Sequence, residues 1–177
     1  MKPICVLGVM TNERGVAIAQ RMHEWLIPYE VHEVLHDGTA FERPALLEAQ
    51  RIARETRRPV LYLHTRGTVN VYNTTEWTHR MWKREFGDQW RKYQLLVHTE
   101  RPAVFAPFVD WDCYTRYNGF IANAAAWDKA PLPAYKDRHD YEHIWETVPD
   151  VDVIGTLVHK PDGAIKEIRE YLRINFG

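Results

Sequence analysis

Residues 60 to 67 read Val-Leu-Tyr-Leu-His-Thr-Arg-Gly, an apolar run that passes directly into polar residues. The first half, with Pro59 before it, has the pattern of a strand that is buried on both faces of a sheet. The second half supplies a titratable ring, a hydroxyl, a permanent cation and a glycine that permits a tight turn. Ligands of open α/β sheets bind just beyond the carboxyl ends of the strands. We therefore expect a substrate site here, formed by His64, Thr65, Arg66 and Gly67.

Two strands and two helices are predicted before this stretch. Apolar character predicts strands over residues 4–10 and 29–35. An amphipathic helix is predicted over residues 15–27, ended by Pro28, and a second one from Pro44 to about Arg57. The apolar residues at helical spacing in the first helix are Val16, Ala19, Met22 and Leu26. This alternation with short links predicts a parallel sheet with right-handed crossovers.

The remaining residues continue the same single domain, residues 1–177. A stripe of apolar residues predicts a core-facing helix that Thr74 or Thr75 caps and that Gly87 and Asp88 kink or split. The stripe consists of Trp82, Phe86, Trp90, Tyr93 and Val97. A strand over residues 103–109 contains Pro107, which favours a sheet edge or a bulge. A short helix over residues 141–148, a strand over 153–158 and a closing turn and helix over 161–172 follow. The predicted fold class is α/β, a Rossmann-like domain with a mostly parallel sheet.

Composition and charge argue against several classes of protein, and only mildly against a nucleic-acid partner. A net charge of −1 gives no overall basic field for nucleic acids, although Arg51, Arg54, Arg57 and Arg58 cluster on one predicted helix. We interpret that cluster as a solvated helix face. Cys5 and Cys113 are too few for a disulfide framework, which suits a reducing compartment such as the cytoplasm. No stretch approaches the roughly 20 apolar residues of a membrane span, and the amino terminus is interpreted as a strand rather than a signal peptide.

Familiar catalytic motifs are missing from the sequence. No P-loop and no Gly-x-Gly-x-x-Gly follow the first strand, which weakens a dinucleotide-cofactor hypothesis. The chain contains no serine, so a serine hydrolase is excluded. Two-histidine phosphodiesterase chemistry is also excluded, because the positions two residues after His64 and His98 are Arg66 and Glu100 rather than hydroxyl residues.

Two pairs of carboxylates are candidates for chemistry. Asp110 and Asp112 follow a predicted strand, and alternate residues of an extended segment point the same way, so both could face one divalent ion such as Mn²⁺ or Mg²⁺. Turn capping and salt bridging are the alternative roles for this pair. Asp140 and Glu142 lie at a predicted helix start, where helix capping competes with a role as general base.

The stretch Tyr62-Leu63-His64-Thr65-Arg66-Gly67 resembles the Tyr-Leu-His-Thr-Lys-Gly signature of small bacterial and phage-associated glycosyltransferase-like proteins. A Trp-Arg-containing helix start in that family is similar to residues 77–81 here. Its His-Phe-Ser-Gly-Asn-Phe-Trp-Trp-Ala segment is similar to residues 116–124, although the paired tryptophans and the Ser-Gly-Asn are absent from this chain. The order of these parts covers residues 4 to 172.

The resemblance implies an A-type nucleotide-diphospho-sugar transferase fold and transfer of a sugar from a nucleotide-sugar donor to an acceptor that it does not specify. Residues 1–67 would form the nucleotide side, with Thr11 at the nucleotide, and residues 68–177 the acceptor side. The implied acceptor-site residues are Trp77, Tyr117, Asn118 and Gly119, and the implied bases are Asp140 and Glu142. The metal-binding Asp-x-Asp of that fold would occupy the position of His64-Thr65-Arg66. Either Asp110 and Asp112 hold the metal instead, or Arg66 holds the diphosphate without one.

Two other functions fit the same residues. The first is a non-catalytic nucleotide or sugar binder, which the altered acceptor segment favours. The second is a flavodoxin-like nucleoside-processing enzyme in which Glu142 is a nucleophile. The strand order separates this enzyme from a glycosyltransferase, whose sheet includes an antiparallel strand near the acceptor side.

Overall fold

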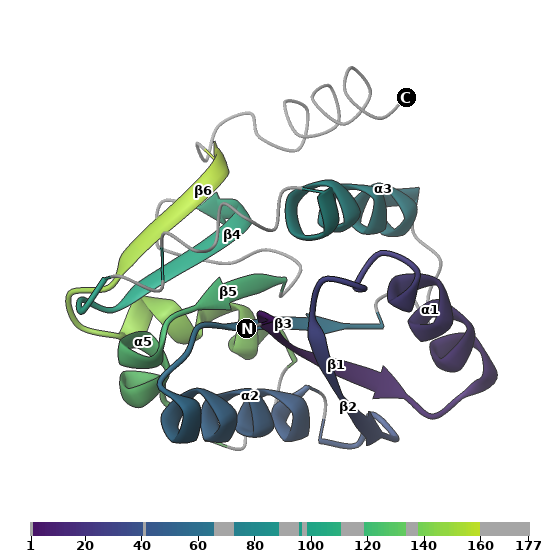
Figure 1. The fold of residues 1–177 in the computed structure, drawn as a ribbon, viewed down its shortest axis with the longest axis horizontal. Helices are drawn as coiled ribbons and strands as arrows, with labels where there is room; N and C mark the ends of the chain where they lie inside the picture. The colour runs from purple at the N-terminus through teal and green to yellow at the C-terminus, as the bar shows by residue number, and fades with distance from the viewer. Residues whose placement is uncertain are drawn as a thin grey trace.

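The computed structural model of the protein describes residues 2–40, 42–65, 73–88, 96, 99–110, 119–133 and 138–159. These residues form a six-stranded sheet with helices on both faces (Figure 1). The strands are β1 (Ile4–Met10), β2 (Glu30–His36), β3 (Val60–His64), β4 (Ala103–Asp110), β5 (Phe120–Ala122) and β6 (Asp152–His159). The helices are α1 (Glu13–His23), α2 (Arg43–Thr56), α3 (Asn73–Trp82) and α5 (Ala124–Lys129), with a π-helix η1 (Lys83–Asp88) and a 3-10 helix η4 (Arg138–Thr147).

The sheet is mostly parallel, with the strand order β2-β1-β3-β5-β4-β6. β1 pairs in parallel with β2 and β3, and β4 pairs in parallel with β6. β5 is antiparallel to both of its neighbours, β3 and β4, so it reverses direction between them. The predicted α/β class and the mostly parallel sheet are confirmed. The carboxyl ends of the five parallel strands therefore meet at one edge of the sheet.

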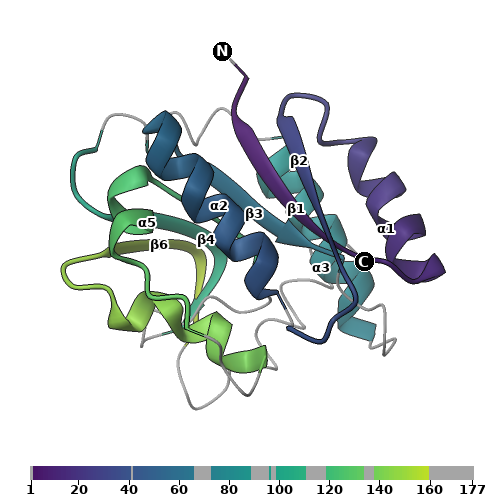
Figure 2. The same cartoon turned by 90° about the horizontal axis from the view of Figure 1, so that it is seen from below.

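The order in which strands are added to the sheet reverses at β1, because β2 lies on one side of β1 and β3 on the other. α1 leads outward from β1 to β2, and its buried side chains Ile18 and Met22 pack on one face with Leu7 and Leu63. α2 returns from β2 to β3 on the opposite face, where Leu46 packs with the β3 side chains that point that way. Figure 2 shows α2 and α5 together on this second face. Such a reversal point is where open α/β sheets bind their ligands.

The core on the α2 face is rich in aromatic rings. Trp127 and Trp145 lie 5.3 Å apart between ring centres, and Phe120 lies 5.0 Å from Trp145. Tyr62 of β3 lies 5.4 Å from Phe120 and completes the row. The predicted helix over residues 141–148 is confirmed as the helical segment η4. Its apolar residues Tyr141, Ile144 and Trp145 are buried, as is Val148 directly after it.

Helix α1 differs from its prediction at both ends. It begins at Glu13 because Asn12 caps it, accepting a 2.7 Å hydrogen bond from Gly15 N. It ends at His23, well before Pro28. The expected core position of Val16 is wrong, since this side chain is 42% exposed and the buried face runs through Ile18 instead.

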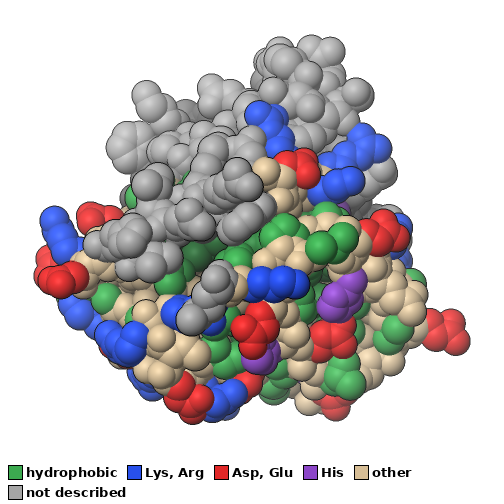
Figure 3. Space-filling model, in the orientation of Figure 1, with side chains coloured by type: hydrophobic (Ala, Val, Ile, Leu, Met, Phe, Trp, Pro, Cys, Tyr) green, Lys and Arg blue, Asp and Glu red, His purple; other side chains and the backbone are tan. Residues whose placement is uncertain are grey.

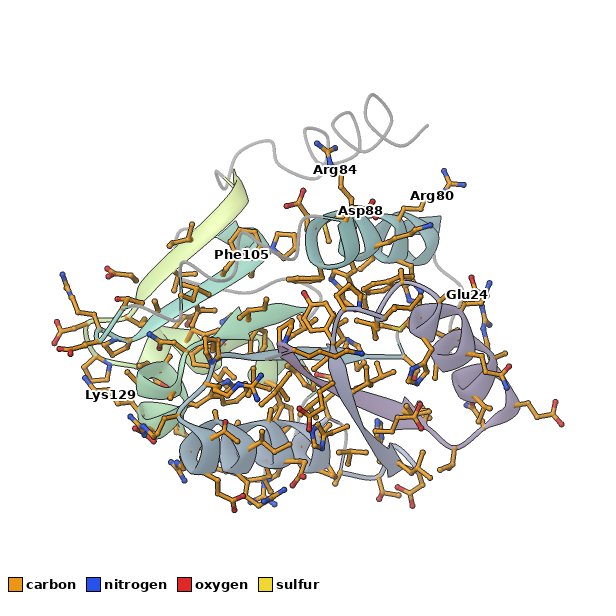
Figure 4. The ribbon with its side chains drawn as sticks, viewed as in Figure 1. Glu24, Arg80, Arg84, Asp88, Phe105 and Lys129 are labelled. Carbon is orange, nitrogen blue, oxygen red and sulfur yellow. The ribbon has the colours of Figure 1, made fainter. Side chains whose placement is uncertain are left out.

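The helix that follows β3 begins at Asn73 and passes into the π-helical segment η1. Trp82 and Phe86 are buried as predicted, and the remaining stripe residues lie outside the described ones. The predicted irregularity at Gly87 takes the form of this π-helix, in which Gly87 packs on the ring of Trp25. Figure 4 shows Arg80 and Arg84 pointing away from the sheet on the outer side of these helices.

β5 corresponds to no predicted strand, and β4 lies in the interior of the sheet rather than at its edge. β5 has three residues, too few to show a strand pattern. Pro107 was expected to mark an edge strand or a bulge, and the first of these alternatives is wrong, because β4 lies between β5 and β6. Pro107 is tolerated because the pairing of β4 with β5 involves Val104 and Phe105 and stops before the proline. The predicted turn and helix over residues 161–172 lie outside the described residues.

The arginine cluster at the end of α2 lies at the surface, and three of its four members form ion pairs there. Its members are Arg51, Arg54, Arg57 and Arg58. Arg51 lies 2.6 Å from Glu48, and Asp128 lies 2.6 Å from Arg57 and 3.6 Å from Arg54. Acidic and basic side chains also alternate along the lower rim of the surface in Figure 3. The interpretation of this cluster as a solvated helix face therefore agrees with its pairing.

Candidate functional site

Four polar side chains gather where β2 and β3 end and α2 begins. We call them the edge cluster, which consists of His36, Glu42, Tyr62 and His64. His36 and His64 are the last residues of their strands, and Glu42 is the residue directly before α2. All four lie beside the reversal point between β1 and β3, at the carboxyl edge of the sheet.

His64 is held from three sides. Its Nδ1 lies 3.4 Å from Oε1 of Glu42, and both side chains are largely buried, at 12% and 13% exposed. The ring of Tyr62 stacks almost parallel to the imidazole, with 6.2 Å between ring centres and an interplanar angle of 9°. Trp82 approaches edge-on with 5.7 Å between centres. The imidazole therefore has a defined plane and a carboxylate beside one nitrogen.

His36 reaches the same cluster from the neighbouring side of β1. A Cβ built on Gly8 would lie 3.6 Å from Nε2 of His36 and 3.5 Å from Cβ of His64, so Gly8 separates the two histidines. Both ring nitrogens of His36 are buried and have no hydrogen-bond partner among the described residues. Burial lowers the pKa of His36, and the negative charges of Glu42 and Asp37 partly oppose this.

Tyr62 contributes a buried hydroxyl beneath His64. The hydroxyl has no hydrogen-bond partner among the residues described by the structure. Burial raises the pKa of Tyr62 well above its usual range, and the nearby Glu42 and Tyr141 raise it further. Tyr62 is therefore a neutral donor in this site. A buried hydroxyl without a hydrogen-bond partner destabilises the fold by about 1–3 kcal/mol. Such a cost indicates that Tyr62 is kept for a role other than packing.

The outer rim of the site comes from the loops after β1 and β2. The backbone N of Thr11 donates to the carbonyl of His36 at 3.0 Å, which ties these loops together. Oδ1 of Asp37 accepts hydrogen bonds from N and Oγ1 of Thr39, at 2.8 and 2.7 Å. The hydroxyl bond, then the backbone bond, lower the pKa of the Asp37 carboxyl. The rim therefore presents an exposed, ionised carboxylate next to the predicted nucleotide contact Thr11.

Thr65 closes the end of β3 against β1. Its backbone N donates to the Gly8 carbonyl at 2.9 Å, and its hydroxyl oxygen accepts from Met10 N at 3.0 Å. The residue is 3% exposed. The hydrogen bond from Met10 N to the Thr65 hydroxyl explains why a hydroxyl residue follows His64. Contact between Thr65 and a substrate stays a prediction.

The other predicted site residues are placed only in part. Gly119 is buried, and a Cβ there would lie 2.2 Å from Nε1 of Trp82, so close packing requires glycine. Asp110 ends β4 at the same edge of the sheet as His64. Trp77 lies on α3, and Asp140 and Glu142 lie on η4 on either side of buried Tyr141; their side chains are outside the description. The predicted residues outside the described ones are Arg66, Gly67, Asp112, Tyr117 and Asn118.

Four members of the site were not predicted as site residues: His36, Asp37, Glu42 and Tyr62, the last of which was expected only as part of the buried strand. His36 and Asp37 directly follow the predicted strand over residues 29–35, and that position at a strand end was the available signal. Glu42 precedes the first-turn proline Pro44, a setting that looks like ordinary helix capping. It makes no capping hydrogen bond, and its carboxylate faces His64 instead.

The described residues contain no group of three or more His, Cys, Asp or Glu side chains that could hold a metal ion. The predicted metal site at Asp110 and Asp112 stays a prediction, because Asp112 is outside that part of the chain. What the described arrangement offers is a carboxylate–imidazole pair beside a neutral phenol, a set of groups that can move a proton at the sheet edge.

Comparison with known proteins finds no matching family model, no matching curated protein and no matching solved structure. Within the described ranges, no helix combines the length and the apolar character needed to cross a membrane.

The lowered pKa of His36 predicts a pH-dependent stability. Because the folded state resists protonation, this contribution is fully present above the ordinary histidine pKa of about 6.5 and declines as the pH falls below it. We expect the His36→Gln variant to lose less stability than the wild type between pH 7.5 and 5.5. Urea unfolding at several pH values measures this, and equal pH dependence of both proteins would contradict it.

Proposed function

We propose that the protein is a glycosyltransferase that takes a sugar from a nucleotide-sugar donor bound at the carboxyl edge of β1, β2 and β3. The observation that carries the proposal is the edge cluster, which lies at the point where α/β sheets bind ligands. It holds a largely buried carboxylate–imidazole pair, beside the buried polar atoms of His36 and Tyr62, which have no hydrogen-bond partner among the described residues. The resemblance of residues 62–67 to a glycosyltransferase-like signature supports the same class.

In this proposal, the nucleoside of the donor contacts the rim formed by Thr11 and Asp37. An acidic residue near the end of a strand is a suitable acceptor for ribose hydroxyls, and hydrogen bonds from Thr39 already orient the Asp37 carboxylate. The diphosphate then lies toward His64 and Arg66, where the guanidinium fork matches phosphate geometry. A divalent ion held by Asp110 and Asp112 is the alternative means of neutralising the diphosphate.

The acceptor side of the proposed site would lie across β3. Trp77, Tyr117, Asn118 and Gly119 are its proposed residues, and the Gly119 backbone is buried against Trp82, which also touches His64. The antiparallel strand β5 follows directly after Gly119.

The sheet topology favours this proposal over a flavodoxin-like nucleoside-processing enzyme. Flavodoxin-like sheets follow the order 2-1-3-4-5. The present sheet shares the β2-β1-β3 part and then inserts antiparallel β5 between β3 and β4. A strand reversed at this position is the feature expected of a glycosyltransferase sheet near its acceptor side.

A thermal-shift screen with the diphosphate sugars of uridine, guanosine, thymidine and cytidine, each with and without Mn²⁺, tests donor binding. A ligand present at ten times its Kd stabilises the folded state by about 1.4 kcal/mol, which corresponds to a rise in Tm of roughly 3–5 °C. We expect one donor to give such a shift, and Asp37→Asn to reduce it. Asp152→Asn is the matched control, because Asp152 is an exposed carboxylate at the opposite edge of the sheet. No shift with any donor would contradict the proposal.

Donor hydrolysis separates an enzyme from a non-catalytic binder. Glycosyltransferases that bind their donor are expected to release nucleoside diphosphate slowly even with water as the acceptor. We therefore expect nucleoside diphosphate to accumulate over hours when the protein is incubated with the donor that shifts its Tm. Binding without any hydrolysis or transfer would instead support the non-catalytic binder.

A further inference from the structure

We propose that His64 is the catalytic base of this site and that Glu42 is the residue that positions it. This inference rests on the proposed function and assigns the proton transfer to residues other than Asp140 and Glu142. Glu42 has no capping bond to the helix that it precedes, and its carboxylate lies 3.4 Å from Nδ1 of His64. Carboxylate–imidazole pairs in unliganded sites commonly tighten when substrate binds.

The pairing of Glu42 with His64 determines which ring nitrogen of His64 accepts the proton. Because Oε1 of Glu42 lies 3.4 Å from Nδ1 of His64, we infer that the proton of the neutral imidazole resides on Nδ1 and its lone pair on Nε2. Stacking by Tyr62 and the edge contact of Trp82 fix the plane of the ring. Because His64 is the last residue of β3 and 12% of its side chain is exposed, the ring borders both the core and the sheet edge.

In the reaction, a hydroxyl of the acceptor gives its proton to Nε2 of His64. The acceptor oxygen forms a bond with C1 of the donor sugar as the bond between C1 and the diphosphate oxygen breaks. The electron pair of the broken bond leaves with the nucleoside diphosphate. Glu42 stabilises the imidazolium that results, as the acid of a triad stabilises its histidine. This single displacement inverts the configuration at C1.

Several groups around His64 influence its charge. Glu42 approaches from the start of α2, and the neutral Tyr62 hydroxyl lies on β3 itself. His36 reaches toward it from β2 across Gly8. On the α3 side, His79 stacks on Trp82 at 5.5 Å between ring centres. Glu42 is the one carboxylate in this set, so its removal is expected to change the protonation of His64 most.

NMR of the histidine rings tests the pair without relying on activity. In the wild type we expect His64 to be protonated on Nδ1 when neutral. In Glu42→Gln the titration midpoint of His64 is expected at lower pH, because the negative charge is gone while a hydrogen-bond acceptor is kept. In Glu48→Gln, the matched control on the same helix, the midpoint should not move, since Glu48 pairs with Arg51 at the surface. A His64 ring protonated on Nε2, or a midpoint unaffected by Glu42→Gln, would overturn the positioning role.

Kinetics with the donor identified by the thermal-shift screen tests the catalytic role. General bases contribute about 10²- to 10⁴-fold, so His64→Gln should reduce turnover at least 100-fold, a far larger effect than its effect on donor affinity. Turnover in the wild type should rise with pH through the His64 midpoint, and in Glu42→Gln this rise should move to lower pH by the same amount as the NMR midpoint. Glu48→Gln should match the wild type.

The outcomes separate the two proposals. A wild type that turns over no donor overturns the proposed function and this inference with it. A wild type that is active while His64→Gln keeps activity within about threefold overturns the base assignment alone. Activity that falls as the pH rises through the His64 midpoint also overturns it, because His64 would then act as a cation on the diphosphate.

Discussion

Replacing Asn123 with alanine is expected to lower the free energy of unfolding by about 3–5 kcal/mol. The side chain is 3% exposed. Its Oδ1 accepts from the backbone N atoms of Ala103 and Ala126 at 3.1 and 2.9 Å. Its Nδ2 donates to the carbonyls of Thr99 and Arg101 at 3.1 and 2.7 Å. Alanine removes all four bonds and takes from the buried N–H groups of Ala103 and Ala126 the side-chain oxygen that accepts from them.

Asn12→Ala is the matched control, because Asn12 is also a helix cap. It is exposed and makes one capping bond, to Gly15 N, so its loss should cost only about 1 kcal/mol. Urea unfolding of both variants measures the difference. Equal losses would mean that Asn123 acts as a cap alone. Because Asn123 lies at the edge of the sheet opposite to the edge cluster, the folded fraction of Asn123→Ala should bind donor as the wild type does.

The first half of the fold could be predicted from the sequence because its signals are local. β1 matches its predicted range because the apolar run from Ile4 to Met10 is buried along its length. Pro44 correctly marked the first turn of α2. Val16 was misplaced because exposed apolar residues share the helical spacing of buried ones, and only packing against the sheet decides which face turns inward.

β5 and half of the site could not be predicted for a different reason. β5 exists through pairing of Phe120 with Tyr62, residues far apart in the chain, and three residues carry no periodicity of their own. His64 was found because it ends an apolar run. His36 joins it only through the register of β1 with β2 and β3, which sets Met10 beside His36 and Gly8 beside His64. That register follows from the assembled sheet. Glu42 joins it from the start of α2, far from His64 in the sequence.

Gly119→Ala is expected to destabilise the protein by about 3 kcal/mol, at the upper end of overpacking effects. A Cβ at this position would lie 2.2 Å from Nε1 and 2.4 Å from Cε2 of Trp82, a side chain that is fully buried. The indole of Trp82, which also contacts His64, therefore has to move. Urea unfolding measures the loss, and near-UV circular dichroism reports the displaced tryptophan.

Two further variants decide whether the clash with Trp82 is the cause. Gly87→Ala is the matched glycine control, since its Cβ would meet the ring of Trp25 at 3.1 Å, where a small shift suffices and a loss below about 1 kcal/mol is expected. Trp82→Phe removes the indole atoms that overlap the new Cβ, at the cost of a cavity. The double variant Gly119→Ala/Trp82→Phe should therefore be more stable than the sum of the single losses by at least about 1 kcal/mol. Additive losses would show that Gly119 is required for its backbone rather than for its closeness to Trp82.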